Sequence, residues 1–129
     1  MQHFFRSRAE SFRFAFSGWW YVLRTQKNAW IHALATILVL LLAAWLGLPL
    51  IDWVILILTI AVVWTAEFLN TALEAVVDLA SPDKHPLAKV GKDVGAAAVL
   101  ISAMAAALIG LMLIGPPLVG KLSVIFNLR

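Results

Sequence analysis

Three long apolar stretches decide what this 129-residue chain can fold into. The first runs from Ala33 to Ile51, the second starts at Trp53 and keeps helical character to Ala80, and the third runs from Val94 to Val119. A helix needs about 20 apolar residues to cross a bilayer core about 30 Å thick. Because the chain is also 63% hydrophobic and only 13% charged, an ordinary soluble domain is excluded. We predict an all-α integral membrane protein with three transmembrane helices.

Turn-forming residues set the expected boundaries. Pro49 and Asp52 end the first stretch, and Ser81-Pro82-Asp83 stops the second. Pro86 suits the first turn of the third helix because proline has no amide hydrogen to leave unpaired, and Gly115-Pro116-Pro117 should break that helix near its end. We expect one membrane domain over residues 1–129, with helices at about 29–50, 53–80 and 86–115 and a tail at 116–129.

Aromatic and basic residues are mixed ahead of the first span. They include Phe12, Phe14, Phe16, Trp19 and Trp20 beside Arg13, Arg24 and Lys27. Such a composition suits a helix that lies in the headgroup plane, so residues 1–28 are expected to form an amphipathic N-terminal surface helix. A signal peptide is the alternative, but the apolar stretch starts far from Met1 and no convincing cleavage site precedes it.

Lysine and arginine are distributed unevenly between the two expected sides of the membrane. The N-terminal segment carries five, and Lys84, Lys89 and Lys92 follow the second span, whereas the opposite side has only Lys121 and Arg129. Cytoplasmic loops carry the excess of basic residues. We therefore expect a multi-pass protein of the inner (plasma) membrane with a cytoplasmic N-terminus. The net charge of +3 on so apolar a chain does not suggest nucleic-acid binding.

Polar residues recur at helical spacing in the second predicted helix. They are Glu67, Asn70, Thr71, Glu74 and Asp78. At about 100° per residue they project as one stripe about 100° wide. If Trp53 marks the outer interface, Glu67 lies about 21 Å along the helix, still at hydrocarbon depth. A carboxylate there costs up to about 3 kcal/mol, so it should face protein, water or a ligand.

A second polar cluster opens the third helix, where Lys89, Lys92 and Asp93 share one face. An antiparallel hairpin would bring it beside the stripe. Carboxylate and amide oxygens could bind a divalent cation, and ammonium groups could hold phosphates, as phosphoryl transfer requires. No stretch fits a Walker A motif, so any nucleotide must be held by another design.

Several residues also have plainer interpretations. The lysines could be ordinary basic anchors of the cytoplasmic side, and Asn70 with Thr71 could fasten helices through hydrogen bonds. His32 is more typical of an interfacial histidine than of a ligand. Gly91 and Gly95 have the spacing of close helix packing. An intramembrane carboxylate also fits a small proton-coupled transporter, although a proton path does not need the lysine cluster.

The polar pattern resembles a known family. Glu67-Phe-Leu-Asn70-Thr71-Ala-Leu-Glu74-Ala-Val-Val-Asp78, followed by His85-Pro-Leu-Ala-Lys89 and Lys92-Asp93, is similar to the prokaryotic integral-membrane diacylglycerol kinases and undecaprenol kinases. The resemblance covers about Phe12 to Gly115. It implies a surface helix plus three membrane helices per chain, a homotrimeric bundle with sites between protomers, and transfer of the γ-phosphate of MgATP to a membrane lipid alcohol, either undecaprenol or diacylglycerol.

The resemblance also implies residue roles. Glu67 would be the general base and Glu74 a metal ligand, with Asn70, Lys92 and Asp93 completing the site. The nucleotide would be lined by Asp83, Lys84 and His85. Gln26 stands where such proteins usually carry a metal-binding glutamate. A neutral amide oxygen can bind Mg²⁺ with less charge to hold it, so a catalytically impaired family subunit is a further alternative.

Overall fold

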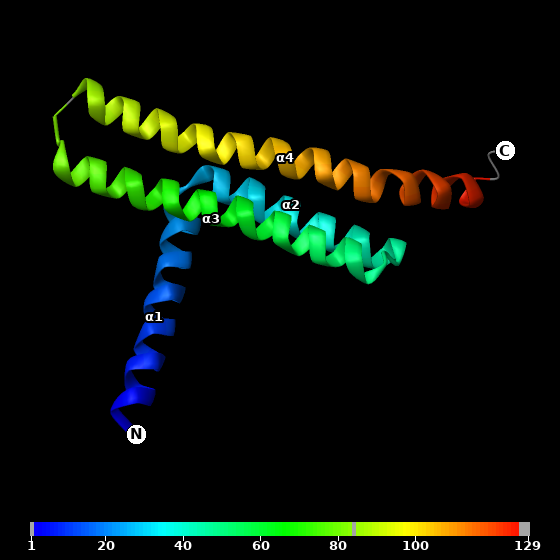
Figure 1. Cartoon of the computed structure of the whole chain (residues 1–129), viewed down its shortest axis with the longest axis horizontal. Helices are drawn as coiled ribbons and strands as arrows, with labels where there is room; N and C mark the ends of the chain where they lie inside the picture. The colour runs from blue at the N-terminus through cyan, green and yellow to red at the C-terminus, as the bar shows by residue number, and fades with distance from the viewer. Residues whose placement is uncertain (1, 84, 127–129) are drawn as a thin grey trace.

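The computed structural model describes residues 2–83 and 85–126, with side chains from Glu10 onward. This part of the chain forms four helices and no strand (Figure 1). They are α1 (Gln2–Thr25), α2 (Lys27–Leu46), α3 (Leu50–Ala80) and α4 (Pro86–Ile125). α2, α3 and α4 are each long and apolar enough to cross a membrane. The predicted all-α architecture and its three apolar helices are confirmed.

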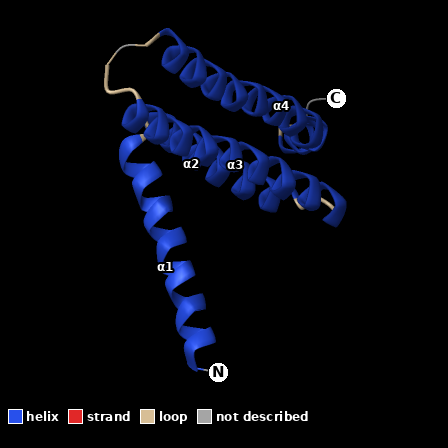
Figure 2. Ribbon diagram, turned by 60° about the vertical axis from the view of Figure 1, so that its left-hand side comes forward, coloured by secondary structure: helices blue, strands red, loops and turns tan. Residues whose placement is uncertain are grey.

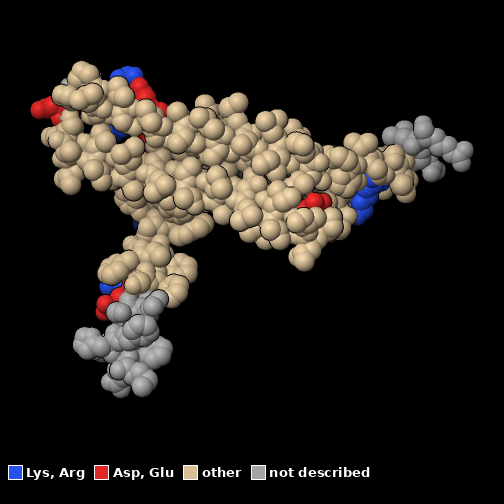
Figure 3. Space-filling model, viewed as in Figure 1, with Lys and Arg blue, Asp and Glu red and all other residues tan. Residues whose placement is uncertain are grey.

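The three apolar helices lie lengthwise against one another, and α1 leaves them crosswise (Figures 1 and 2). α3 and α4 form an antiparallel hairpin that makes most of the contacts between helices. On the face drawn in Figure 3, charged side chains gather near the two ends of this bundle and on α1, with an uncharged length between. Large apolar side chains stay exposed on α2 and α4, among them Leu38, Leu41, Ile101, Leu108 and Leu111. Such a surface needs apolar surroundings, as a multi-pass membrane protein has.

An extended residue separates α1 from α2. Gln26 has φ −103° and ψ 114°, so the helix expected over residues 1–28 ends at Thr25 and a new one starts at Lys27. The junction is fixed by packing, because the Trp19 ring lies 4.8 Å from that of Trp64 and 4.9 Å from that of Phe68. These aromatic contacts hold the α1–α2 junction over the middle of α3.

The turn between α2 and α3 lies earlier than predicted. α2 ends at Leu46, because Gly47 adopts φ 71°, a left-handed conformation that glycine takes without steric cost and that commonly ends helices. Pro49 then caps α3, which begins at Leu50 rather than 53. Leu48, in this turn, is buried against a cluster that includes Ala43 of α2 and Ile114 of α4.

The expected helix break at Gly115-Pro116-Pro117 is wrong. α4 contains both prolines and continues to Ile125, so most of the predicted tail is helical. Tertiary contacts on both sides of the prolines explain this. Ile114 is buried against α2 and α3, and Lys121 donates a hydrogen bond to the carbonyl of Trp45 while lying over its ring. Neighbouring helices can offset the backbone hydrogen bonds that proline removes.

Candidate functional site

Two amides hold the carboxylate of Glu74 beneath the α1–α2 junction. Gln26 Nε2 donates to Glu74 Oε2 at 2.9 Å, and Asn70 Nδ2 donates to Glu74 Oε1 at 3.1 Å. Asn70 reaches Glu74 from one turn earlier on α3, whereas Gln26 is 48 positions away in sequence. Three of the predicted site residues therefore meet at one place.

Glu67 lies two turns deeper on the same stripe. Its side chain is only 1% exposed and is the largest one fully buried in the described residues. His32, from α2, faces it, with Nε2 3.9 Å from Glu67 Oε2. Sequence reasoning did not place His32 in the site. The only signal was a histidine early in an apolar stretch, and no periodicity connects residues on two different helices.

Asn70 is packed between its own helix and α4. It is buried, and its Oδ1 atom has no hydrogen-bond partner among the described residues. Gly95 of α4 lies directly opposite, where an added Cβ would overlap Asn70 Oδ1 and come within 3.1 Å of Leu73 Cδ2. At Gly91 the same atom would meet only Val77 Cγ2, at an ordinary 3.8 Å. The close packing expected from the glycine spacing is therefore confirmed, and its tightest point lies against a predicted site residue.

Gly95→Ala should destabilise the protein by about 1–3 kcal/mol, the usual cost of overpacking, and lower kcat because Asn70 must move. Thermal unfolding in detergent and an activity assay would measure the two effects. Gly91→Ala is the matched control, since it adds the same methyl group at a position where that group makes only an ordinary van der Waals contact. Equal stability and rate in the two variants would contradict the packing role of Gly95.

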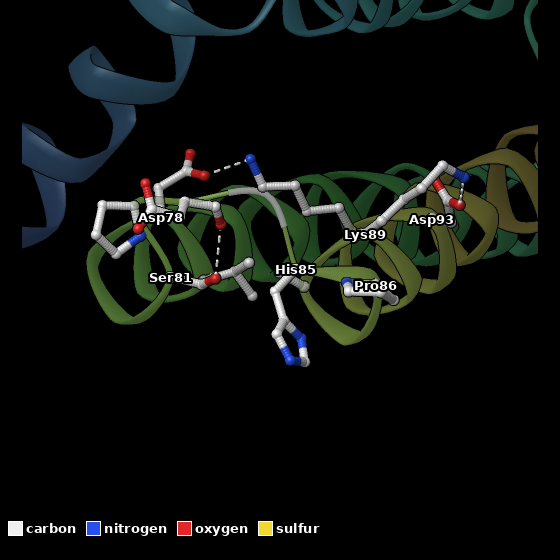
Figure 4. A pocket seen from close by; sticks show the side chains of 11 residues that line it. Asp78, Ser81, His85, Pro86, Lys89 and Asp93 are labelled. Atoms are coloured by element: carbon white, nitrogen blue, oxygen red, sulfur yellow. Dashed lines mark hydrogen bonds and ion pairs between the residues drawn. The ribbon is translucent and has the colours of Figure 1, made fainter.

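The other predicted residues surround a hollow of about 530 Å³ where α3 ends and α4 begins (Figure 4). Its polar lining includes Asp78, Asp83, His85, Lys89, Lys92 and Asp93. Lys92 Nζ lies 2.5 Å from Asp78 Oδ1, and Lys89 Nζ lies 2.6 Å from Asp93 Oδ2. Four of the five predicted nucleotide residues thus lie together, and the fifth, Lys84, is outside the described residues.

His85 also organises the loop. Its Nδ1 atom accepts a hydrogen bond from the Leu87 amide at 3.2 Å, so it caps the start of α4. Pro86 occupies the first turn of α4, as predicted. The Ser81 hydroxyl donates to the carbonyl of Asp83 at 2.9 Å. Figure 4 shows the His85 imidazole projecting out from the loop.

The polar group on α3 and the hollow remain separate within one chain. Glu67, Asn70 and Glu74 do not line the hollow. Asp78, one turn beyond Glu74 on the same helix, does line it. In the described residues no three His, Cys, Asp or Glu side chains come close enough to hold a metal ion together. The group around Glu74 offers carboxylate and amide oxygens, and the hollow adds the ammonium groups of Lys89 and Lys92 together with its aspartates.

Comparisons with known proteins point to one family. Residues 13–114 match the family model described as prokaryotic diacylglycerol kinase. The chain is 40% identical over 109 residues to an undecaprenol kinase of Bacillus subtilis, covering 84% of this chain and 89% of that protein. It is 45% identical over 109 residues to a diacylglycerol kinase of Synechocystis, covering 84% and 62%. Identity to the Escherichia coli diacylglycerol kinase is 38% over 87 residues, covering 62% and 71%. The family match contains every predicted site residue.

Proposed function

Since the chain belongs to the prokaryotic diacylglycerol kinase family, we propose that it transfers the γ-phosphate of MgATP to the hydroxyl of a membrane lipid. The chain is a lipid kinase. Its relatives are named for two acceptors, undecaprenol and diacylglycerol, and both remain candidates here.

The observation that carries the mechanism is the buried carboxylate of Glu67. A carboxylate inside an apolar span is costly to keep, and such residues usually serve function. We assign Glu67 as the general base. It takes the proton of the lipid hydroxyl as the hydroxyl oxygen bonds to the γ-phosphorus. The bond from that phosphorus to the β,γ-bridging oxygen breaks, ADP leaves, and the proton passes later to solvent.

The residues around Glu74 suit the Mg²⁺ that kinases of this family imply. Mg²⁺ usually takes one or two protein carboxylates and completes its shell with substrate phosphates and water. Glu74 offers a carboxylate that the Asn70 amide holds in place at 3.1 Å, whereas Asn70 Oδ1 faces Gly95 and is turned away from that carboxylate. The Gln26 amide, already 2.9 Å from Glu74, can turn its oxygen to the same place. When bound, the ion neutralises charge on the phosphates.

The hollow between α3 and α4 is our candidate for the nucleotide. Lys92 and Lys89 supply ammonium groups for phosphates, and Asp83 and His85 line its rim. Lys92 must leave Asp78 to meet a phosphate, because the two are ion-paired without ligand. We also propose that Lys84 and Asp93 belong to the nucleotide site.

We place α1 on the cytoplasmic membrane surface and the working enzyme in a homotrimer. The crosswise exit of α1 from the three apolar helices suits a helix parallel to the bilayer (Figure 2). The separation of the Glu67 group from the nucleotide hollow suits a site completed by a neighbouring protomer. Cross-linking that yields no species above a monomer in an active preparation would contradict the trimer.

A phosphorylation assay tests the function. Purified protein in mixed micelles should transfer label from γ-labelled ATP to undecaprenol, diacylglycerol or both, and only with Mg²⁺ present. The ratio of the two kcat/KM values decides the acceptor. Absence of transfer to both lipids under conditions that support an Escherichia coli diacylglycerol kinase control would contradict a kinase and favour an impaired subunit.

Gln26→Glu should lower the half-saturating Mg²⁺ concentration by about threefold or more. The substitution places a second carboxylate beside Glu74, and anionic ligands hold Mg²⁺ more tightly than neutral ones. Lipid preference should stay unchanged, because the residue lies at Glu74 and away from the acceptor. The measurement is a Mg²⁺ titration of kcat at fixed lipid.

Gln26→Met serves as the control, since it keeps the length and offers no oxygen. It should raise the Mg²⁺ requirement. An unchanged Mg²⁺ titration in both variants of an active protein would remove Gln26 from the metal site and leave the assignments on α3 intact.

A further inference from the structure

Two buried polar atoms face each other without partners in the described part of the chain. They are His32 Nε2 and Glu67 Oε2, 3.9 Å apart. That separation is too long for a hydrogen bond. Leaving a buried polar group unpaired is energetically costly. The pair therefore has unused hydrogen-bonding capacity for a third polar group.

The imidazole is held in place from the side. The His32 side chain is 14% exposed, and its ring meets that of Trp64 edge-on with centroids 6.4 Å apart. Trp64 is itself fixed, because its Nε1 donates to Thr36 Oγ1 at 3.2 Å and its ring packs on Trp19 and Phe68. A ring so supported can present Nε2 to one defined point.

An apolar cavity reaches the His32 side of this pair, although Glu67 itself is not in its lining. It has a volume of about 290 Å³ and lies between α2, α3 and α4, with His32 and Val63 in its lining. Val63 is one turn from Glu67. Most other lining side chains are aliphatic, including Val39, Leu56, Ile60 and Ile109. An alcohol carried on an apolar chain could approach the pair through this cavity, whereas the nucleotide hollow lies at the loop end of α3.

The distance between the two atoms fits a bridging hydroxyl. If an oxygen lay about 2.8 Å from each atom, the angle at that oxygen between His32 Nε2 and Glu67 Oε2 would be about 90°. A hydroxyl has one hydrogen to donate and two lone pairs to accept. It can donate to the Glu67 carboxylate and accept from an imidazole that carries its hydrogen on Nε2. One lone pair stays free for attack on phosphorus.

We propose that His32 is a catalytic residue that binds the acceptor hydroxyl and holds it against Glu67. The inference rests on the proposed function, because it needs Glu67 as the base. His32 Nε2–H donates to the lipid oxygen, Glu67 receives the proton, the O–P bond forms, and ADP leaves. His32 itself neither gains nor loses a proton in the step.

Two substitutions of equal length test the hydrogen bond. His32→Gln keeps an N–H donor near the position of Nε2, and His32→Met removes it with an adaptable apolar side chain. His32→Met should lower kcat/KM for the lipid by about tenfold or more and leave the KM for ATP within about twofold. His32→Gln should stay within about threefold of wild type. Trp30→Phe, at an exposed neighbouring position, is the control.

Stability separates this role from a structural one. His32→Met should unfold at a temperature equal to or above that of His32→Gln, because burying an amide in an apolar site is the costlier change. Of the two variants, the less active His32→Met should therefore be at least as stable as His32→Gln. Parallel losses of both would overturn the proposal. If neither His32→Met nor a second donor-free variant, His32→Leu, folds while His32→Gln is active, the role is structural and the proposal fails.

The Glu67→Gln variant distinguishes failure of the base assignment from failure of the His32 proposal. If Glu67→Gln is inactive and His32→Met equals wild type, the His32 inference is wrong and the base assignment stands. If Glu67→Gln retains activity, the base assignment itself fails. When both hold, His32→Met should cost less in the Glu67→Gln background, because the two residues act on one hydroxyl.

Discussion

Glu67→Gln should lower kcat by about 10²–10⁴-fold and leave the affinity for ATP within a few-fold, the range expected for loss of a general base. The amide has the size and shape of the carboxylate but cannot take the hydroxyl proton. Glu67 is fully buried and does not line the nucleotide hollow, so nucleotide binding has no reason to change. Steady-state kinetics with varied lipid and varied ATP would measure both quantities.

Asp52→Asn is the matched control. Asp52 lies on the same helix, in its first turn at the opposite end of the bundle, and the same charge is removed there. It should keep nearly full activity. A Glu67→Gln enzyme with more than about a tenth of the wild-type kcat would refute the base assignment.

Glu74→Gln should raise the half-saturating Mg²⁺ concentration by about tenfold or more and lower kcat at limiting Mg²⁺. The carboxylate held by Gln26 and Asn70 would become a third amide, so this group would lose its formal charge. The KM for the lipid should change little, because Glu67 and His32 are untouched. A Mg²⁺ titration at saturating lipid checks the expectation.

Lys92→Ala provides the contrasting variant. It removes an ammonium group of the nucleotide hollow and frees Asp78, so it should chiefly raise the KM for ATP. If Glu74→Gln and Lys92→Ala change the Mg²⁺ and ATP dependences in the same proportion, the division into a metal side and a phosphate side is wrong.

Local patterns in the sequence were enough to predict the three apolar helices and the polar stripe on α3. Apolar length predicted three spans, Pro86 predicted the start of α4, and the spacing of Glu67, Asn70 and Glu74 predicted one face of α3. These features succeed because each depends on residues within a few helical turns. The same reasoning failed at Pro116-Pro117, where contacts with α2 and α3 outweigh a local helix-breaking preference.

By itself the sequence determined that this is an all-helical chain with three apolar spans and a carboxylate buried in one of them, since hydrophobic length and helical period are local properties. Only the tertiary structure decided what each polar group meets. Gln26 reaches Glu74 because the chain changes direction at this extended residue while Trp19 packs α1 against α3. His32 reaches Glu67 because α2 packs on α3 in one particular orientation about its own axis. A pairing across two helices depends on how far each is turned about its axis, and the packing of whole side-chain surfaces sets that rotation.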